Sequence, residues 1–336
     1  MPSFERDSNR IVIAGASSLL GAELKSLLEE SRFAGWDLRL LDEEVAAGTL
    51  TEAGGEPAVI QPVEEGSFDR ARLIFFTGSA EFTRANLAGA RQSKAQIVDL
   101  SGASLDETGT DPWFEHLQAL RGAALELDAG LYEIPSVSAV AGIMLSYALK
   151  PLGLNWLSLV AFYPVSEAGR AGIEELEAQT AQLLSSRSVG QPVFDVQVAF
   201  NMAAQYGTQS RYDLRKIRGR VFEEARIALP PGAVIPTVQV IHAPVFYGTT
   251  FSATAELNQG LESKQVGEAC SNAGFVVQAK EGSGPSNVTA AGENVIQLAY
   301  PESDRSTAKR WFFWGAADNI RMPAWNAVKL AEKLVR

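Results

Sequence analysis

The sequence has few residues that could form a disulfide or bind a metal. It contains one cysteine and two histidines in 336 residues. One cysteine excludes an internal disulfide framework and any site built from several thiolates, such as a structural zinc or iron–sulfur centre. His116 and His242 lie far apart in the sequence and have no metal-ligand spacing. We therefore expect no metal site.

An excess of positive charge and a long apolar run are also missing. The chain has 29 Lys and Arg against 40 Asp and Glu, so its formal net charge is −11, and it has no basic block. This balance argues against nucleic acid or an anionic membrane as a partner. The most apolar stretch, 137–165, is interrupted by Lys150, Pro151 and Asn155, and the N-terminal residues contain no hydrophobic signal core. We expect a cytoplasmic protein.

The first third of the chain alternates strand-like and helix-like patterns. Apolar runs at 10–14, 37–41, 73–77 and 95–99 are typical of buried strands, and 22–30 places leucines on one helical face. Strands that alternate with helices at this spacing indicate βαβ units. The sequence therefore predicts an α/β fold with an N-terminal, Rossmann-like domain built on a parallel sheet.

The pattern changes after about residue 133. Helix-like segments at 140–149 and 168–185 are followed by strands without regular alternation, which predicts a mixed α+β domain. The strand candidates are 157–162, 237–243, 250–257, 274–279 and 309–314. An amphipathic helix is expected over 322–335. We expect two domains, 1–132 with 317–336 and 133–316, and the aromatic run 311–314 predicts either core or interface.

A glycine-rich turn follows the first predicted strand. A strand, a turn and a helix in this order can hold a pyrophosphate on backbone N–H groups and the helix N-terminus. The candidate cofactor-binding residues of this turn are Gly15, Ala16, Ser17, Ser18, Leu19 and Gly21. Ser18 stands where a middle glycine would admit the phosphate, so retained dinucleotide binding and an inherited turn with no cofactor are both open.

The acidic run Asp42-Glu43-Glu44 follows the second predicted strand. A carboxylate there can accept hydrogen bonds from ribose hydroxyls, and it would repel a 2′-phosphate. If a cofactor binds, Asp42 therefore favours NAD over NADP. The alternative is that these acids begin a solvated helix, where the helix dipole favours them.

Several segments also carry a family resemblance. They are GASSLLG at 15–21, DLSGA at 99–103, KPL at 150–152, VSEAG at 165–169, EEL at 174–176, and ADNIR at 317–321 with NAV at 326–328. In this order they resemble the GATGxVG, DxSxA, LKPL, VSGAG…DEL and SDNLRKGAALNAV segments of the aspartate-β-semialdehyde dehydrogenase family. The resemblance implies a Rossmann domain to which the C-terminal helix returns, a central α+β domain that forms a homodimer, and NADP as cofactor. It adds Asn319 to the candidate cofactor-binding residues.

The family works through a cysteine thioester, and the residues of that chemistry are replaced here. Where the family has its nucleophile, glutamine, general base, substrate-binding arginine and phosphate-binding arginine, this chain has Val137, Pro164, Thr249, His242 and Leu105. The family's paired glutamate and lysine align with Lys216 and Gly219. Valine cannot form an acyl intermediate, and loss of one group from a cooperative catalytic set already costs several powers of ten in rate.

The resemblance is therefore to the Usg-like branch that lacks the catalytic cysteine. It implies a pseudoenzyme whose cleft binds a nucleotide or another small molecule. An NAD(P)-dependent oxidoreductase of the aspartate-semialdehyde dehydrogenase type, or one using direct hydride transfer, is the alternative. Cys270 is expected to be a buried helix residue. Ser136 or Ser138 could replace the nucleophile only with a base, for which His242 is the candidate; otherwise His242 is a hydrogen-bonded strand residue.

Overall fold

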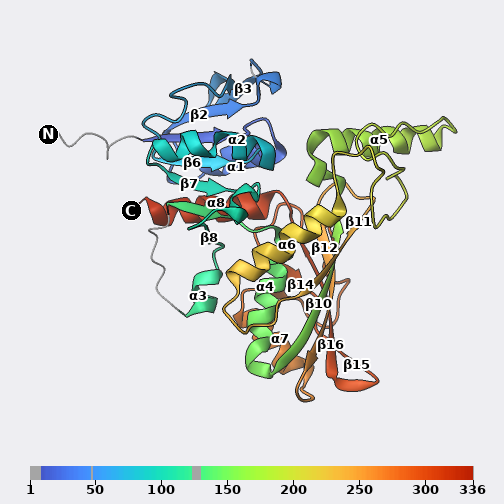
Figure 1. Cartoon of the computed structure of the whole chain (residues 1–336). Helices are drawn as coiled ribbons and strands as arrows, with labels where there is room; N and C mark the ends of the chain where they lie inside the picture. Colours follow the sequence, from blue (N-terminus) through green and yellow to red (C-terminus); the bar gives the residue numbers. More distant parts are fainter. Residues whose placement is uncertain (1–8, 47, 123–129, 336) are drawn as a thin grey trace. The chain divides into compact units, whose positions relative to one another are not determined.

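The computed structural model describes residues 9–46, 48–122 and 130–335. The chain forms two compact units (Figure 1). The first contains the described residues up to Pro135 and from Pro323 onward, and the second spans Ser136–Met322. Among the described residues, every helix is too short or too polar to span a bilayer.

The first unit is built on a parallel sheet. Its strand order is β5-β2-β1-β6-β7-β9-β8, and every pair is parallel. The strands are β1 (Arg10–Ala14), β2 (Asp37–Asp42), β5 (Gln61–Pro62), β6 (Leu73–Phe76), β7 (Gln96–Asp99), β8 (Asp111–Pro112) and β9 (Leu131–Glu133). Because β1 lies between β2 and β6, the strand order reverses there. This reversal point is where doubly wound sheets bind ligands. The predicted α/β class is confirmed.

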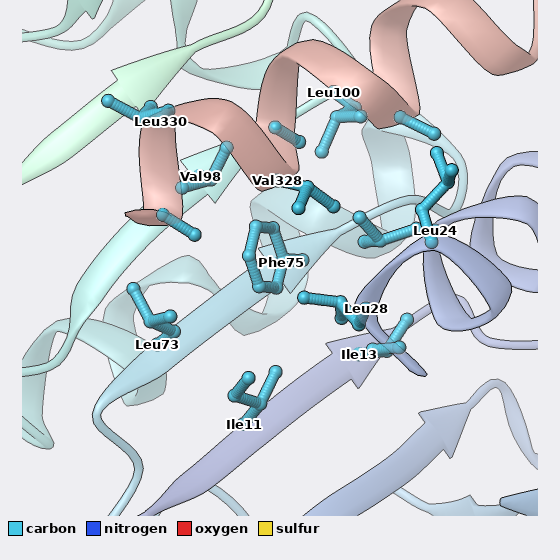
Figure 2. Packing of buried hydrophobic residues seen from close by; sticks show 14 of the residues in the cluster. Ile11, Ile13, Leu24, Leu28, Leu73, Phe75, Val98, Leu100, Val328 and Leu330 are labelled. Carbon is cyan, nitrogen blue, oxygen red and sulfur yellow. The ribbon is translucent and has the colours of Figure 1, made fainter. Parts of the chain in front are cut away.

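Helices cover both faces of this sheet. Side chains from α1 (Leu19–Glu29) and α8 (Arg321–Leu334) pack on Ile11, Ile13 and Phe75 of one face (Figure 2). Helix α2 (Ala80–Gln92) contributes Phe82 and Leu87 to a second cluster on the alternate residues of the same strands. The C-terminal helix therefore completes the core of the N-terminal sheet.

Some details of the first unit differ from the sequence prediction. Helix α1 begins at Leu19 rather than residue 22, because the Ser18 side chain accepts a hydrogen bond from the Gly21 N–H and caps the helix. The ribbon of β3 (Leu50–Ala53) and β4 (Glu56–Val59) was not predicted, since each strand has only four residues and most of them are exposed. His116 is the N-cap residue of the five-residue α3 (Leu117–Arg121) and makes no side-chain capping hydrogen bond.

The second unit contains a mixed sheet in the order β11-β10-β12-β16-β14-β13, and β15 pairs with β16. The strands are β10 (Leu154–Tyr163), β11 (Thr237–His242), β12 (Thr249–Leu257), β13 (Val276–Val277), β14 (Gln297–Leu298), β15 (Glu302–Asp304) and β16 (Thr307–Ala317). The strand expected at 274–279 is only two residues long. Gly274 and Phe275 still donate to carbonyls of the preceding helix, so the strand cannot begin earlier.

Helices pack on one face of the mixed sheet. They are α4 (Val137–Leu149) and α7 (Ser263–Asn272), together with α6 (Leu214–Ala228), which packs on α4 and β11; α5 (Gly169–Leu184) follows a short turn, η4 (Val165–Ala168). Trp311 and Phe313 of β16 are buried, whereas Phe312 and Trp314 are exposed on the other face. The aromatic run therefore contributes alternate residues to the core and to an outer sheet face on which Phe312 and Trp314 are exposed.

Candidate functional site

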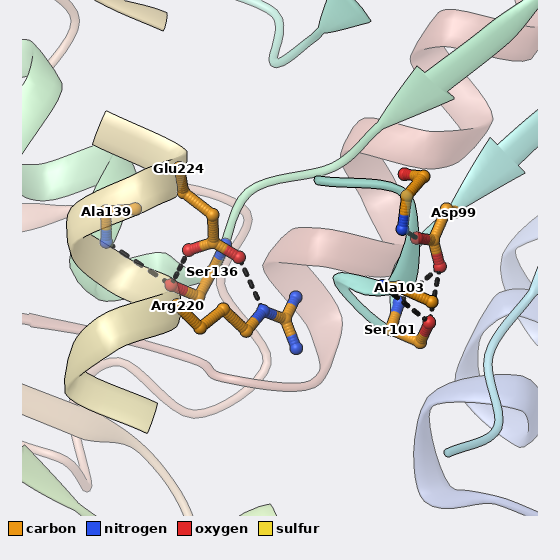
Figure 3. Close-up of polar contacts among 8 residues, drawn as sticks. Asp99, Ser101, Ala103, Ser136, Ala139, Arg220 and Glu224 are labelled. Atoms are coloured by element: carbon orange, nitrogen blue, oxygen red, sulfur yellow. Dashed lines mark hydrogen bonds and ion pairs between the residues drawn. The ribbon is translucent and has the colours of Figure 1, made fainter. Parts of the chain in front are cut away.

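The N-terminus of α4 is joined to α6 by a buried carboxylate. Ser136 is the N-cap of α4, and its hydroxyl donates to Glu224 Oε2 at 2.5 Å and accepts from the Ala139 N–H (Figure 3). The Ser136 N–H also donates to Glu224, at 3.1 Å. Arg220, one turn earlier on α6, donates its Nε–H to the other carboxylate oxygen at 2.6 Å. Glu224 is completely buried, so these donors replace the water that its charge would otherwise require.

Val137 opens α4 directly after Ser136 and is buried. The hydroxyl of Ser138 is buried near the Tyr163 hydroxyl and lowers the pKa of Tyr163, but burial of the phenol outweighs this and raises that pKa. Tyr163 therefore stays protonated in the ordinary pH range. The start of α4 carries two hydroxyls and a hydrocarbon, with no thiol.

Glu167 lies in the η4 turn, and the residue as a whole is exposed. The turn is held by backbone bonds, because the Val165 and Ser166 N–H groups donate to the carbonyls of Val245 and Phe246. Although the side chain is exposed, protein atoms crowd its carboxyl, and this desolvation raises the pKa of Glu167 to about 7. Arg220 and a hydrogen bond from Asn319 act in the opposite direction.

Asn319 fixes the position of that carboxyl. Its side-chain NH₂ group donates to Glu167 Oε1 at 3.0 Å and to the Ser166 hydroxyl at 3.1 Å. Its carbonyl oxygen accepts from the Gly248 N–H at 3.0 Å. The amide is buried, and its hydrogen-bonding groups are used inside the second unit. The family resemblance assigns Asn319 to cofactor binding, and in the structure its side chain is bonded to Glu167, Ser166 and Gly248.

His242 ends β11 and is completely buried. Its ring nitrogens lie 3.3 Å from the Tyr206 hydroxyl and 3.3 Å from the Val198 carbonyl. Burial lowers the pKa of His242, which favours the neutral ring. The Ser136 hydroxyl donates its hydrogen bond to Glu224 and not to His242. His242 therefore belongs to a structural hydrogen-bond network.

The other sequence candidates for chemistry lie in inert settings. Cys270 is buried in α7, and burial raises the pKa of its thiol to about 12. Thr249 begins β12, and its buried hydroxyl has no hydrogen-bond partner among the described residues. Pro164 precedes the η4 turn as its N-cap. No group of three or more His, Cys, Asp or Glu suited to a metal occurs in the part of the chain that the structure describes.

The glycine-rich turn lies at the reversal point of the parallel sheet. Gly15 has a φ of +98°, and a Cβ there would come within 2.1 Å of the Gly78 nitrogen. Its N–H and that of Ala16 donate to the Leu41 carbonyl, while the Ser18 hydroxyl donates to the Thr77 carbonyl at 2.9 Å. The turn is therefore held tightly against β2 and β6, and the Ser18 hydroxyl proton points to the protein.

Asp42 closes the same turn from the end of β2. Its Oδ2 accepts the Ser17 N–H at 2.7 Å, and its Oδ1 accepts the Glu43 N–H at 2.8 Å. The first N–H groups of α1, at Leu19 and Leu20, have no intrahelical acceptor because they open the helix. These helix N–H groups fit a pyrophosphate, and the carboxylate at the end of β2 fits a ribose hydroxyl.

A second carboxylate organises the turn after β7. Asp99 is completely buried and accepts the Ser101 N–H and hydroxyl on one oxygen and the Ser104 N–H on the other (Figure 3). Leu105 follows in the short helix η2 (Ala103–Asp106). An apolar, half-buried side chain thus stands where the resemblance assigns a phosphate-binding arginine.

Comparison with known proteins places this arrangement in a family. The family model described as "Semialdehyde dehydrogenase, dimerisation domain" matches residues 147–322. A USG-1 protein homolog from Azotobacter vinelandii is 30% identical over 97% of this chain and 97% of its own length. The chain belongs to the semialdehyde dehydrogenase family.

Solved structures agree with this membership. A structure of a probable aspartate-semialdehyde dehydrogenase from Pseudomonas aeruginosa has a TM-score of 0.85 at 30% identity, covering 97% of this chain and 98% of that one. A structure of aspartate semialdehyde dehydrogenase with NADP from Candida albicans has a TM-score of 0.65 at 14% identity, covering 97% and 98%. At the lower identity the likeness shows the fold. The family resemblance inferred from the sequence segments is confirmed, and the similar proteins include a USG-1 protein homolog.

Set against the family pattern, the structure reveals charged residues that the sequence reasoning missed. The family's glutamate and lysine align with Lys216 and Gly219, which are both exposed; the side chain that contacts Ser136 is Glu224, and Arg220 pairs with Glu224. The available signal was a glutamate on the apolar stripe of α6, between Val221 and Ala228. Glu167 was also readable, since it stands where the semialdehyde dehydrogenase segment VSGAG has its first glycine.

Proposed function

We propose that this chain is a semialdehyde dehydrogenase-family protein that binds a dinucleotide and a small ligand but does not perform thioester chemistry. The observation that carries the proposal is the buried Val137 at the position of the family nucleophile. A branched hydrocarbon cannot attack a carbonyl. Thr249, at the base position, cannot exchange a proton at neutral pH, so nucleophile and base are missing together.

A coupled assay tests the missing chemistry. The full chain is incubated with aspartate semialdehyde, phosphate and NAD or NADP, and reduced cofactor is followed by absorbance. We expect no turnover above the uncatalysed rate. An enzyme-like rate of about 1 s⁻¹ or more, abolished in a Ser136→Ala variant, would refute the proposal and identify Ser136 as the nucleophile.

For the cofactor we propose NAD over NADP. The Asp42 carboxylate at the end of β2 supports this choice, because its negative charge opposes a 2′-phosphate. Titration followed by the fluorescence of the six tryptophans is expected to give tighter binding of NAD. An Asp42→Asn variant, which retains an acceptor for the Ser17 N–H, is expected to narrow the NAD:NADP preference about tenfold, or about 1.4 kcal/mol. Equal affinities in the unaltered chain would contradict the assignment.

We further propose that the mixed sheet forms a homodimer through its uncovered face. Phe312 and Trp314 of β16 are exposed there, and Trp314 contacts Phe162 of β10 with ring centroids 5.9 Å apart. An apolar sheet face of this kind normally packs on another surface. The chain is expected to elute at twice its mass in gel filtration, and Trp314→Glu is expected to give monomers. A monomeric unaltered chain would exclude the dimer.

Direct hydride transfer on another substrate is a second candidate function. Glu167 favours it, because a carboxyl whose pKa is about 7 can both give and take a proton at neutral pH. The hydride itself would come from a nicotinamide cofactor. Screening alcohols and amines for reduction of bound NAD, with Glu167→Gln as the comparison, distinguishes this candidate from a protein that only binds.

A further inference from the structure

Glu167 is a charged group that the η4 turn does not need for its own structure. The backbone bonds from Val165 and Ser166 to Val245 and Phe246 hold the turn without it. Asn319 holds only Oε1 of the carboxylate, so Oε2 can accept a further hydrogen bond from a ligand. The residue is exposed as a whole, and Oε2 has no hydrogen-bond partner among the described residues.

The charges around Glu167 favour a cation. Arg220 and Glu224 both act on its carboxyl, but they form an ion pair with each other at 2.6 Å. With Glu167 ionised, these three side chains carry one net negative charge. Tyr163 and Tyr206 are the other titratable groups near the carboxylate; burial chiefly, and Glu167 to a smaller extent, raise the pKa of both phenols, so they stay neutral.

In the second unit, the arginine that the family resemblance assigns to substrate binding is replaced. His242 occupies the position of the substrate-binding arginine, and it is buried and engaged with Tyr206 and Val198. The acid at 167 has been added where the family segment has glycine. Relative to the family segments, this unit therefore has one arginine fewer and one carboxylate more.

We propose that Glu167 binds the ammonium group of a small primary amine. An ammonium group has three N–H donors, so it can donate to Oε2 of Glu167 while Asn319 keeps Oε1 in place. The proposal goes beyond the missing thioester chemistry and dinucleotide binding, and it concerns only residues of the second unit.

The proton equilibrium of Glu167 gives the binding a definite pH dependence. Its pKa is about 7 in the free protein, so the carboxylate that an ammonium requires is fully present only above that value. Below it, affinity falls tenfold for each pH unit. Binding is therefore expected to be about thirtyfold weaker at about pH 5.5 than at about pH 8, while the amine itself stays protonated at both values.

The test uses simple probes on the full chain without dinucleotide. Ligand-observed NMR measures how tightly the protein binds each primary amine in a series that runs from methylamine through n-butylamine. The alcohol of equal chain length is the uncharged counterpart of each amine. We expect saturable binding of at least one amine, with the pH dependence given above, and weaker binding of its alcohol. Glu167→Gln is expected to lose at least tenfold in affinity, whereas Glu177→Gln, an exposed acid on α5, keeps it.

Each contrary result overturns the proposal. It fails if no amine binds saturably up to ~50 mM, if alcohols bind as well as amines, or if Glu167→Gln binds like the unaltered chain. Thermal unfolding of the variant checks that a lost affinity does not reflect a lost fold. Because no dinucleotide or aldehyde is present, failure here leaves the missing thioester chemistry to be decided by its own assay.

Discussion

Replacing Glu224 with alanine is expected to destabilise the protein by about 3–5 kcal/mol, as the removal of one partner of a buried ion pair usually does. Glu224 is completely buried and accepts three hydrogen bonds, from the Ser136 N–H, the Ser136 hydroxyl and Arg220. The variant leaves these donors without their carboxylate and opens a cavity between α4 and α6. Urea unfolding, monitored by tryptophan fluorescence and circular dichroism, measures the change.

The same helix offers a matched control. Glu223 is the next residue, and it accepts a hydrogen bond from Arg226 at the same distance of 2.6 Å, but both side chains are largely exposed. Glu223→Ala is expected to cost less than about 1 kcal/mol, because solvent screens such pairs. If the two substitutions lower the free energy of unfolding equally, burial is not the reason that the Glu224 contacts stabilise the protein.

Substituting alanine for Gly15 is expected to cost about 3 kcal/mol or more, a value typical of a backbone conflict in a packed region. The φ of +98° is unfavourable for any residue with a Cβ, and the added carbon would lie 2.1 Å from the Gly78 nitrogen. Both obstacles are backbone, so no side chain can rotate away. We expect the first unit of the variant to unfold at a lower urea concentration than that of the unaltered chain. We also expect the variant to lose the NAD binding proposed above.

Gly35→Ala separates the two causes. Gly35 also has a positive φ, +83°, but nothing lies within 4 Å of the position of its Cβ. We expect only the cost of the left-handed conformation, about 1–2 kcal/mol. If Gly15→Ala is no worse than Gly35→Ala, the turn can move away from β6, and the close approach described for it is not required for stability.

The architecture could be predicted largely from periodicity and segment order. The runs 10–14, 37–41, 73–77 and 95–99 correspond to β1, β2, β6 and β7, because each is short, apolar and bounded by turn residues. Elements whose stability comes from other parts of the chain were not predictable. The strand β14 has two residues, and its pairing with β13 and β16 decides its conformation.

From the sequence, only the replacement of the family's reactive residues at the site could be predicted. The sequence predicts that Val137, Thr249 and His242 stand at reactive positions, because a motif comparison shows what is replaced. It does not predict which side chains fill the space. Glu224 meets Ser136 across 88 residues of sequence. Such a contact depends on the packing of α4 against α6, which local patterns do not encode.

The carboxylate of Glu224 at the start of α4 also affects how reactive a cysteine at that helix end could be. A helix N-terminus normally favours a negatively charged sulfur, and this electrostatic help is part of what makes a cysteine reactive there. Here a fixed anion already occupies that end of the helix. Because the Glu224 carboxylate already accepts the Ser136 N–H and is paired with Arg220, a thiol at position 137 would gain little of this help. We therefore expect that a Val137→Cys substitution alone would not create thioester chemistry.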